Sequence, residues 1–288
     1  MIGAKAPAKI NLFFEVGPLG ANGYHEVVSV YQSLKIFEEV YVEPAQSWKV
    51  TVSGDVSEQA LALIPRDETN LVVKAAKALA RRVGIENPQP MHFNIVKRVP
   101  AAGGLAGGSA DGAAALVALN EAWCLGLDQE TLIDVAKELG ADVPFALLGG
   151  TALGVGSGTE LSALPAADSR EVLLVFSTPG ISTAESFSNF DKMFPNGDIQ
   201  VDAKGFLSGF NFELAGRNSL LGPALALRPD LRELMELVPG RVKLSGSGPT
   251  LYLLSESVSE LESWQAKYQE LGLETLITRF GIEGAGLI

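Results

Sequence analysis

Val99-Pro100-Ala101-Ala102-Gly103-Gly104-Leu105-Ala106-Gly107-Gly108-Ser109-Ala110-Asp111-Gly112 is the most informative stretch of the sequence, and it leads into a strong helix pattern over 113–123. Its glycines let the backbone approach a ligand closely and adopt unusual angles. The N-terminus of the following helix adds unpaired N–H donors and positive dipole character. Ser109 adds a hydroxyl that can reach a phosphate or its magnesium ion. The stretch therefore predicts that Pro100 to Ser109 cradle phosphates.

Two familiar phosphate loops do not fit this stretch. A Walker loop ends in Gly-Lys-Ser or Gly-Lys-Thr, and no lysine lies between Pro100 and Ser109. A Rossmann fingerprint has a different glycine spacing and directly follows the first strand of a βαβ unit. A flexible turn before a helix is the other alternative, but a turn rarely needs four glycines in so few positions. A second glycine loop, Ser245 to Pro249, joins two predicted strands and is equally compatible with a plain turn.

The pattern on either side of the loop predicts an α+β protein. Thr69 or Asn70 can cap one helix, and Asp128 can cap another that stops at Gly140. Further helices are predicted to begin at Pro229 and to cover 261–271, and strands are predicted over 27–36, 40–42, 48–52, 91–95, 172–176, 242–244, 250–254 and 276–280. We place a domain boundary near residue 160, because the strand–helix–strand order beyond it suggests a second α+β domain.

Two ionisable residues lie in apolar surroundings far from the loop. Lys9 stands in Pro7-Ala8-Lys9-Ile10-Asn11-Leu12, and lysine is rarely buried unless it is paired. Asp142 follows a predicted helix end and precedes Pro144. Transfer of a phosphoryl group to an alcohol commonly uses such a cation and such a carboxylate. Each residue alone is more often structural or solvated, and their spacing does not show whether they meet.

Gly23-Tyr24-His25-Glu26 places an aromatic ring beside an imidazole. Such a pair can stack on a heterocycle and hydrogen-bond to its edge. A turn that leads into a strand is the alternative interpretation, and it prevails without other support.

Composition excludes several classes of protein. The 288 residues carry a formal net charge of -12, so the general basic footprint of a nucleic-acid-binding protein is absent. Cys124, the single cysteine, stands among apolar residues and is expected to be a buried thiol. No secretory signal or membrane-spanning run is evident. We therefore expect a cytoplasmic protein that has no nucleic-acid or membrane partner and no obligate protein partner.

Taken together and in order, these motifs resemble the GHMP kinase superfamily. The motifs are Pro7 to Leu12, Gly23 to Glu26, Pro100 to Asp111, Leu139 to Phe145 and Leu244 to Thr250. Within the superfamily, the start at Pro7 with Gly23-Tyr24-His25 is similar to enzymes that act on a methylerythritol unit carried by cytidine diphosphate. The resemblance implies ATP-dependent phosphorylation of the 2-hydroxyl of that unit, in the non-mevalonate route to isoprenoid precursors. It covers nearly the whole chain, although 184–215 matches loosely.

The resemblance also implies two domains with a cleft between them. Residues 1–160 would form an N-terminal ATP-binding domain like domain 2 of ribosomal protein S5. Residues 161–288 would form a C-terminal GHMP kinase domain with a ferredoxin-like core. The small-molecule partner would be the cytidine diphosphate substrate, and the cofactors would be ATP and Mg²⁺.

The roles of individual residues follow from the same resemblance. Asp142 would orient and deprotonate the hydroxyl, and Lys9 would hold Asp142 ionised and stabilise charge. ATP would be bound by Asn70, Leu71, Val72 and Lys97 around adenosine, and by Pro100, Gly103, Gly104, Leu105, Ala106, Gly107, Gly108 and Ser109 around the phosphates. Ser109 is also the candidate ligand of Mg²⁺. The substrate would be bound by Asn11, Tyr24, His25, Phe187, Gly246, Ser247 and Gly248, with Tyr24 and Phe187 on either side of the cytosine and His25 at its edge.

The sequence departs from the family pattern at two places. Gly112 stands where the family usually has alanine, which costs at most about 1 kcal/mol of helix propensity. The segment 183–187 is only loosely family-like, which bears on Phe187. Two alternatives stay open: another GHMP kinase, such as a mevalonate or homoserine kinase, and a non-catalytic nucleotide-binding protein. The S5-like half has relatives that bind RNA, although the acidic composition and the presence of both Lys9 and Asp142 disfavour that class.

Overall fold

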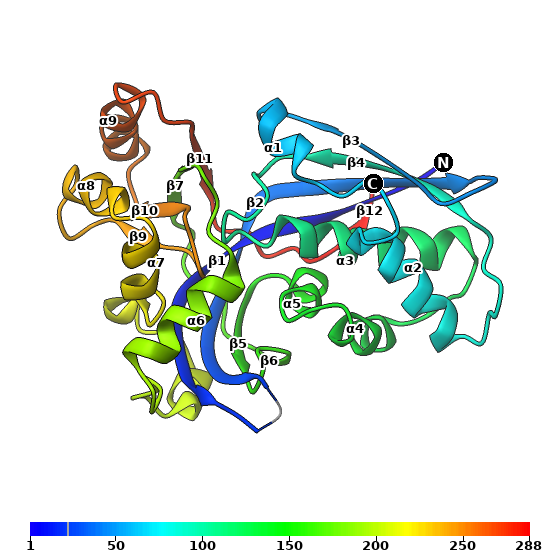
Figure 1. Ribbon diagram of the computed structural model, residues 1–288, viewed down its shortest axis with the longest axis horizontal. Coiled ribbons are helices and arrows are strands. Elements are labelled where there is room, and N and C mark those ends of the chain that lie inside the picture. Colours follow the sequence, from blue (N-terminus) through cyan, green and yellow to red (C-terminus); the bar gives the residue numbers. More distant parts are fainter. Residues whose placement is uncertain (22) are drawn as a thin grey trace.

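A computed structural model describes residues 1–21 and 23–288, and it contains two β-sheets side by side (Figure 1). The first sheet has the order β12-β1-β2-β4-β3; in addition, β5 pairs with β2, β6 with β5, and β8 with β1. The second has the order β11-β7-β10-β9. The predicted α+β architecture is confirmed.

The strands of the first sheet are β1 (Ile2–Leu19), β2 (His25–Pro44), β3 (Lys49–Gly54), β4 (Met91–Lys97), β5 (Thr151–Val155), β6 (Glu160–Ala163), β8 (Arg217–Asn218) and β12 (Gly286–Leu287). Those of the second are β7 (Glu171–Val175), β9 (Lys243–Leu244), β10 (Leu251–Ser255) and β11 (Thr275–Arg279). The helices are α1 (Glu58–Ala62), α2 (Leu71–Arg82), α3 (Gly107–Ala122), α4 (Gln129–Lys137), α5 (Val143–Leu148), α6 (Thr183–Met193), α7 (Leu221–Leu227), α8 (Asp230–Glu236) and α9 (Val258–Gln269), with 3-10 turns η1 (Ala203–Ser208) and η2 (Phe212–Leu214).

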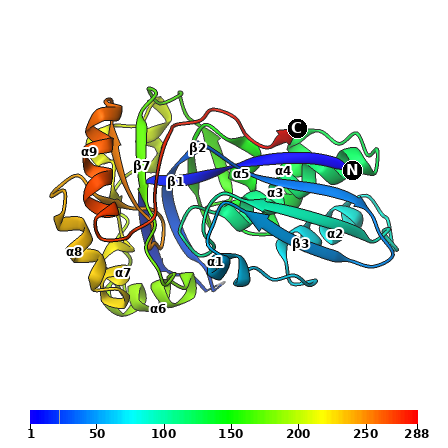
Figure 2. The same ribbon diagram turned by 90° about the horizontal axis from the view of Figure 1, so that it is seen from above.

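The strands β1 and β2 form one long antiparallel pair that reaches from the first sheet to the second (Figure 2). Their middle sections are buried on both faces. Ile10, Leu12 and Leu34 pack there with Leu174 and Tyr252 of the second sheet in one apolar cluster. The pattern showed two short strands in place of β2 and did not mark β1 as a strand. Strands buried on both faces lose the alternation that marks a half-buried strand.

Helices α2 to α5 cover one face of the first sheet (Figure 1). Asn70 and Asp128 cap α2 and α4 as predicted: the Asn70 side chain accepts from the N–H of Val72 at 3.0 Å, and that of Asp128 accepts from the N–H of Thr131 at 2.8 Å. Helix α3 is apolar nearly all round and lies fully inside this layer. It begins at Gly107, six residues before the predicted start at residue 113, so half of the glycine stretch is helical.

The predicted burial of Cys124 is wrong. Its side chain is exposed, because the chain turns at this residue into the left-handed region with φ 52° immediately after α3. Leu125 and Leu127, which follow the turn, pack against the core instead.

We propose that the predicted domains, residues 1–160 and 161–288, correspond to the two sheets with two exchanges. Strand β6 straddles residue 160 and pairs with β5 of the first sheet. Strands β8 and β12 return to β1 from the second half of the chain. Within the described residues, 1–21 and 23–288, no helix combines the length and apolarity needed to cross a bilayer.

The core of the first sheet should dominate stability. Leu119 on α3 is fully buried, whereas Leu271 is 59% exposed. We expect Leu119→Ala to lower the free energy of unfolding by about 2–5 kcal/mol, because it removes buried methyl groups and leaves a cavity. Leu271→Ala should change it by less than about 0.5 kcal/mol. Urea unfolding followed by circular dichroism measures both, and equal losses would contradict this assignment of the core.

Candidate active site

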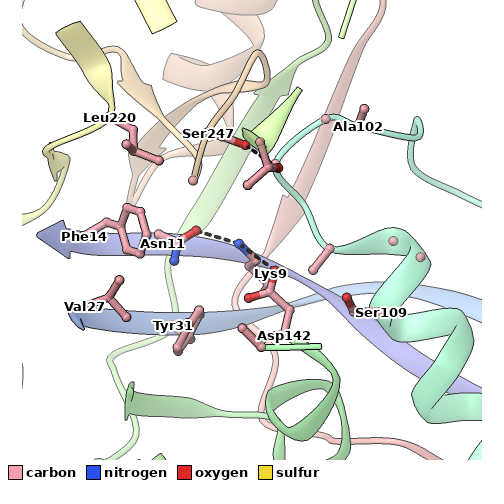
Figure 3. A pocket seen from close by; sticks show the side chains of 18 of the residues that line it. Lys9, Asn11, Phe14, Val27, Tyr31, Ala102, Ser109, Asp142, Leu220 and Ser247 are labelled. Carbon is pink, nitrogen blue, oxygen red and sulfur yellow. Dashed lines mark hydrogen bonds and ion pairs between the residues drawn. The ribbon is translucent and has the colours of Figure 1, made fainter. Parts of the chain in front are cut away.

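A cavity of about 380 Å³ lies between the two glycine loops. It is lined by the middle of β1, the loop before α3, the start of α5 and the loop between β9 and β10 (Figure 3). The predicted residues that line it are Lys9, Asn11, Leu71, Pro100, Gly103, Gly104, Ala106, Gly107, Gly108, Ser109, Asp142, Phe187, Gly246 and Ser247. The structure therefore brings together motifs that lie more than 200 residues apart.

The first glycine loop ends in an open helix N-terminus. The N-cap of α3 is Ala106, with φ 58°, and it has no side chain that could accept from the first N–H groups of the helix. These N–H groups have no partners within the helix itself. Because Gly107, Gly108 and Ser109 line the cavity, their N–H groups are available to an anion there.

The second glycine loop fixes the first one in place. The hydroxyl of Ser245 donates to the carbonyl of Gly104 at 2.9 Å, and the N–H of Thr250 donates to the carbonyl of Gly103 at 3.2 Å. Gly104 has φ 79°, and a Cβ built on it would lie 2.1 Å from the carbonyl oxygen of Ser245. Only glycine fits this approach. The loop from Ser245 to Pro249 is thus part of the cavity wall and more than a plain turn.

Lys9 and Asp142 meet at the bottom of the cavity. The Lys9 ammonium lies 3.6 Å from the Asp142 carboxylate and donates to the Asn11 side chain at 2.7 Å (Figure 3). Asn11 in turn donates to Ser29 at 2.8 Å, which orients its amide. The side chain of Lys9 is 6% exposed and that of Asp142 is 30% exposed. A buried cation is thus paired with a carboxylate that the cavity can still reach.

The local sequence explains the position of Asp142. Pro144 stands in the first turn of α5, where its fixed φ favours the start of a helix. Asp142 is the residue before that helix, and its side chain makes no capping hydrogen bond. Its carboxylate is therefore left for the cavity and for Lys9.

Tyr31 lies beside this pair but is not a candidate base. Its ring stacks on Phe145 at a centroid distance of 5.0 Å, and the Lys9 ammonium lies 5.7 Å from its centroid. Burial, together with the charge of Asp142, raises the pKa of the Tyr31 hydroxyl well above its usual range. The hydroxyl therefore stays neutral, and Asp142 is the carboxylate beside Lys9 in the cavity.

The residues predicted to hold cytosine are only partly brought to the cavity. Phe187 lines it, whereas Tyr24, 67% exposed, and His25 do not. The ring of His25 lies on that of Phe187 with centroids 5.0 Å apart. Its Nδ1 donates to the carbonyl of Gly17 at 2.9 Å, and its Nε2 is 3.3 Å from Asp191. The sandwich of Tyr24 and Phe187 around cytosine stays a prediction.

Several residues predicted around ATP are buried behind the cavity. Leu71 lines it, but Asn70, Val72 and Leu105 are 5%, 0% and 1% exposed and do not. Gly248, predicted on the substrate side, also lies outside the lining. Lys97 is 1% exposed and is held in an ion cluster: its ammonium lies 2.7 Å from Asp111 and 3.2 Å from Glu38. Lys97 therefore does not present its charge to the cavity.

Burial sets the protonation of this cluster. It raises the pKa of Glu38 to about 8, with Lys97 opposing the rise and Asp111 adding to it. It also raises the pKa of Asp111 against the pull of Lys97. Burial disfavours the charged Lys97, but Asp111 and Glu38 together raise its pKa. The raised pKa of Glu38 lets this carboxyl hold a proton near neutral pH.

Some cavity residues were not singled out in the sequence. Phe14, Val27 and Leu220 are apolar residues in core-like patterns, and such patterns do not distinguish a cavity wall from a core. Asn218 was missed although its side-chain amide donates to the carbonyls of Leu244 and Gly246, at 3.1 and 2.8 Å, and so supports the second loop. Asn218 lies just beyond 184–215, the segment that matches the family pattern loosely.

Comparison with known proteins identifies the class first. A sequence model of the GHMP kinases N terminal domain matches residues 70–150, which include the first glycine loop and Asp142. The mevalonate kinase of Methanococcus jannaschii has the same fold, with a TM-score of 0.67 over 97% of this chain and 98% of that one, at 12% identity. Fold and site together define a GHMP kinase, a class of small-molecule kinases.

More similar relatives identify the family within that class. A 4-diphosphocytidyl-2-C-methyl-D-erythritol kinase of Nocardia farcinica is 40% identical over 88% of this chain and 84% of its own. One from Thermobifida fusca is 35% identical over 99% and 97%. A crystal structure of a 4-(cytidine 5'-diphospho)-2C-methyl-D-erythritol kinase superposes with a TM-score of 0.72 at 27% identity, over 97% of this chain and 99% of that one. The chain belongs to the family of 4-diphosphocytidyl-2-C-methyl-D-erythritol kinases.

The raised pKa of Glu38 predicts a pH dependence of stability. The pKa of Glu38 is raised in the folded chain, so its contribution to stability is fully present at low pH and is lost as the pH rises to about 8. Asp111→Asn removes one negative charge and keeps an oxygen that can accept from Lys97. Between pH ~5 and ~8, the free energy of unfolding should fall with rising pH less steeply in this variant than in the unmodified protein. The expected difference between the two slopes is on the order of 1 kcal/mol per pH unit.

Urea unfolding at fixed ionic strength across this pH range measures the slope. Asp134→Asn is the matched control, because Asp134 is an exposed aspartate paired with Lys137 on the helix surface. In Asp134→Asn, the free energy of unfolding should change with pH as steeply as in the unmodified protein. Parallel slopes in Asp111→Asn and the unmodified protein would contradict a rise of the Glu38 pKa caused by Asp111.

Proposed function

We propose that this chain transfers the γ-phosphoryl group of ATP to the 2-hydroxyl of 4-diphosphocytidyl-2-C-methyl-D-erythritol, giving the 2-phosphate and ADP. The reaction belongs to the non-mevalonate route to isoprenoid precursors, and we place it in the cytoplasm. The observation that carries the proposal is the Lys9–Asp142 pair, 3.6 Å apart, in the same cavity as an open helix N-terminus. The relatives named for this reaction supply the identity of the acceptor.

The arrangement supports an in-line transfer. The acceptor hydroxyl would lie against Asp142, whose carboxylate accepts its proton while the hydroxyl oxygen bonds to the γ-phosphorus. The bond from that phosphorus to the bridging oxygen of ADP breaks at the same time. Lys9 keeps the carboxylate paired and offsets the negative charge that develops between the two substrates. The N–H groups of Gly107, Gly108 and Ser109 would hold the phosphates of ATP.

Mg²⁺ fits the same cavity through oxygen ligands. Within 1–21 and 23–288 no group of three or more acidic, His or Cys side chains is placed to hold a metal ion. Kinases commonly bind Mg²⁺ through one or two protein oxygens together with phosphate oxygens and water. The hydroxyl of Ser109 is such an oxygen on the cavity wall. The ion would neutralise charge on the phosphates, with Ser109 as the proposed protein ligand.

The acceptor would extend from Asp142 past Asn11 toward Phe187. Asn11 presents its oriented amide to the polar end of the methylerythritol unit. Gly246 and Ser247, on the opposite wall, would cover the diphosphate. Phe187 offers a ring face for cytosine, with Tyr24 and His25 proposed to complete that end when the substrate is bound.

An ATP-consumption assay tests the acceptor. We expect ADP release with the cytidine diphosphate substrate and none above background with mevalonate or homoserine, because neither carries a heterocycle for Phe187 and its neighbours. The three acceptors are compared at equal concentration with a coupled ADP assay. Turnover with mevalonate or homoserine but not with the cytidine compound would overturn the proposal.

Asp142→Asn tests the catalytic carboxylate. The variant keeps the size of the side chain but cannot take up the proton, so we expect kcat to fall by about 10²–10⁴-fold. The Kd for ATP should stay within about threefold, because the phosphate-binding groups lie on α3 and its loop. Turnover is followed by ADP release and ATP binding by calorimetry.

Asp168→Asn is the control, since Asp168 is an exposed aspartate outside the cavity. Its kcat should match that of the unmodified chain. Normal turnover in Asp142→Asn would remove Asp142 from the mechanism.

A further inference from the structure

We propose that Glu38, Lys97 and Asp111 act as positioning residues that set the conformation of the first glycine loop for the phosphates of ATP. We call these three side chains the ionic clasp. The inference rests on the proposed ATP site, but it concerns residues that do not line the cavity. It assigns Lys97 a role behind the phosphate loop, in place of a contact with adenosine.

Glu38 holds the beginning of the loop. This residue of β2 is fully buried, and its two carboxylate oxygens accept from the N–H groups of Arg98 and Val99, each at 3.1 Å. Arg98 and Val99 are the first residues after β4, where the chain leaves the sheet and enters the loop. A single carboxylate thus fixes the direction in which the loop departs.

Lys97 connects that beginning to the end of the loop. It is the last residue of β4, and its ammonium lies 3.2 Å from Glu38 and 2.7 Å from Asp111. Asp111 stands in the second turn of α3, beyond the loop. The clasp therefore joins the two elements whose relative position determines the shape of residues 98–106.

The clasp lies directly against the residue that begins the phosphate-binding helix. A Cβ built on Gly107 would lie 3.1 Å from the Glu38 carboxylate and 3.2 Å from the Lys97 ammonium. Gly107 also lines the cavity. One glycine therefore separates the clasp from the proposed phosphate site, and a shift of the clasp moves the N–H groups that would hold ATP.

A role in stability alone explains the clasp poorly. A buried ion cluster seldom stabilises a fold more than apolar residues of the same size, because removing charges from water is costly. This cluster carries two carboxylates for one ammonium, and Oδ1 of Asp111 is buried without a hydrogen-bond partner among the described residues. What the charges provide that apolar packing does not is directional hydrogen bonding to Arg98, Val99 and Asp111.

The test separates binding of ATP from binding of the acceptor. Lys97→Met removes the bridge, and we expect the KM for ATP to rise by about tenfold or more, since small misplacements of binding groups have effects of up to about 10². The KM for the acceptor should stay within about twofold, because Lys9, Asn11 and Asp142 do not touch the clasp. Asp111→Asn, which keeps an acceptor for Lys97, should raise the KM for ATP by no more than about threefold.

The double variant Lys97→Met/Asp111→Asn is included in case Lys97→Met alone fails to fold. It leaves Glu38 as the one carboxyl group of the clasp, and Glu38 can be neutral in its protonated form. Lys77→Met is the control, since it breaks an exposed ion pair with Glu68. Circular dichroism selects the variants that fold. An equal rise in both KM values, or an unchanged KM for ATP in every folded Lys97 variant, would overturn the inference.

Calorimetry distinguishes this failure from that of the proposed function. If the unmodified chain binds ATP and the folded Lys97 variants bind it equally well, the clasp has no positioning role. If the unmodified chain binds no ATP, the proposed function itself fails and the clasp inference falls with it.

Discussion

The pairing of β1 with β2 is the constraint on which the rest of the structure depends. The two strands belong to the first sheet and pack against the second, and residues on them supply Lys9, its partner Asn11 and, at Glu38, the support of the glycine loop. The hydroxyl of Tyr252, in the second sheet, donates to the carbonyl of Asn11 at 2.9 Å. The second sheet is thus tied to the backbone of the site itself. A change in the register of β1 would move Lys9 to the other face of its strand.

Local signals in the sequence were sufficient to predict much of the helical structure. Asn70 and Asp128 were predicted as caps because their side chains compete for N–H groups of the first turn, which depends on neighbouring residues alone. The long strands were harder, because their burial on both faces comes from elements far along the chain. The start of α3 was missed for a similar reason. Glycines at 107 and 108 have weak helix propensity, and at Gly107 the Val99 side chain and the clasp lie close against the start of the helix.

Many residues of the candidate site could be predicted from the sequence, but their arrangement in space could not. Local chemistry marked Lys9, Asp142 and the first glycine loop, and only the family resemblance indicated that they meet. The burial of individual side chains could not be predicted from the sequence. Nothing in the sequence indicates that carboxylates enclose Lys97 or that Leu71 lines the cavity. For Tyr24 and His25, the resemblance named residues whose side chains lie outside the cavity in this structure.

The charge of the site explains why the first glycine loop has two separate supports. The chain has a formal net charge of -12, yet both proposed substrates are anions. Among the described residues that line the cavity, Lys9 is the one cationic side chain, and it is shared between Asp142 and Asn11. Attraction for two sets of phosphates would therefore come largely from backbone N–H groups and from the proposed Mg²⁺. N–H groups act through direction and not through net charge, so they are effective only when the loop has one fixed shape. That requirement accounts for two separate supports on the same loop, Ser245 and Thr250 from the second sheet on one side and the clasp on the other.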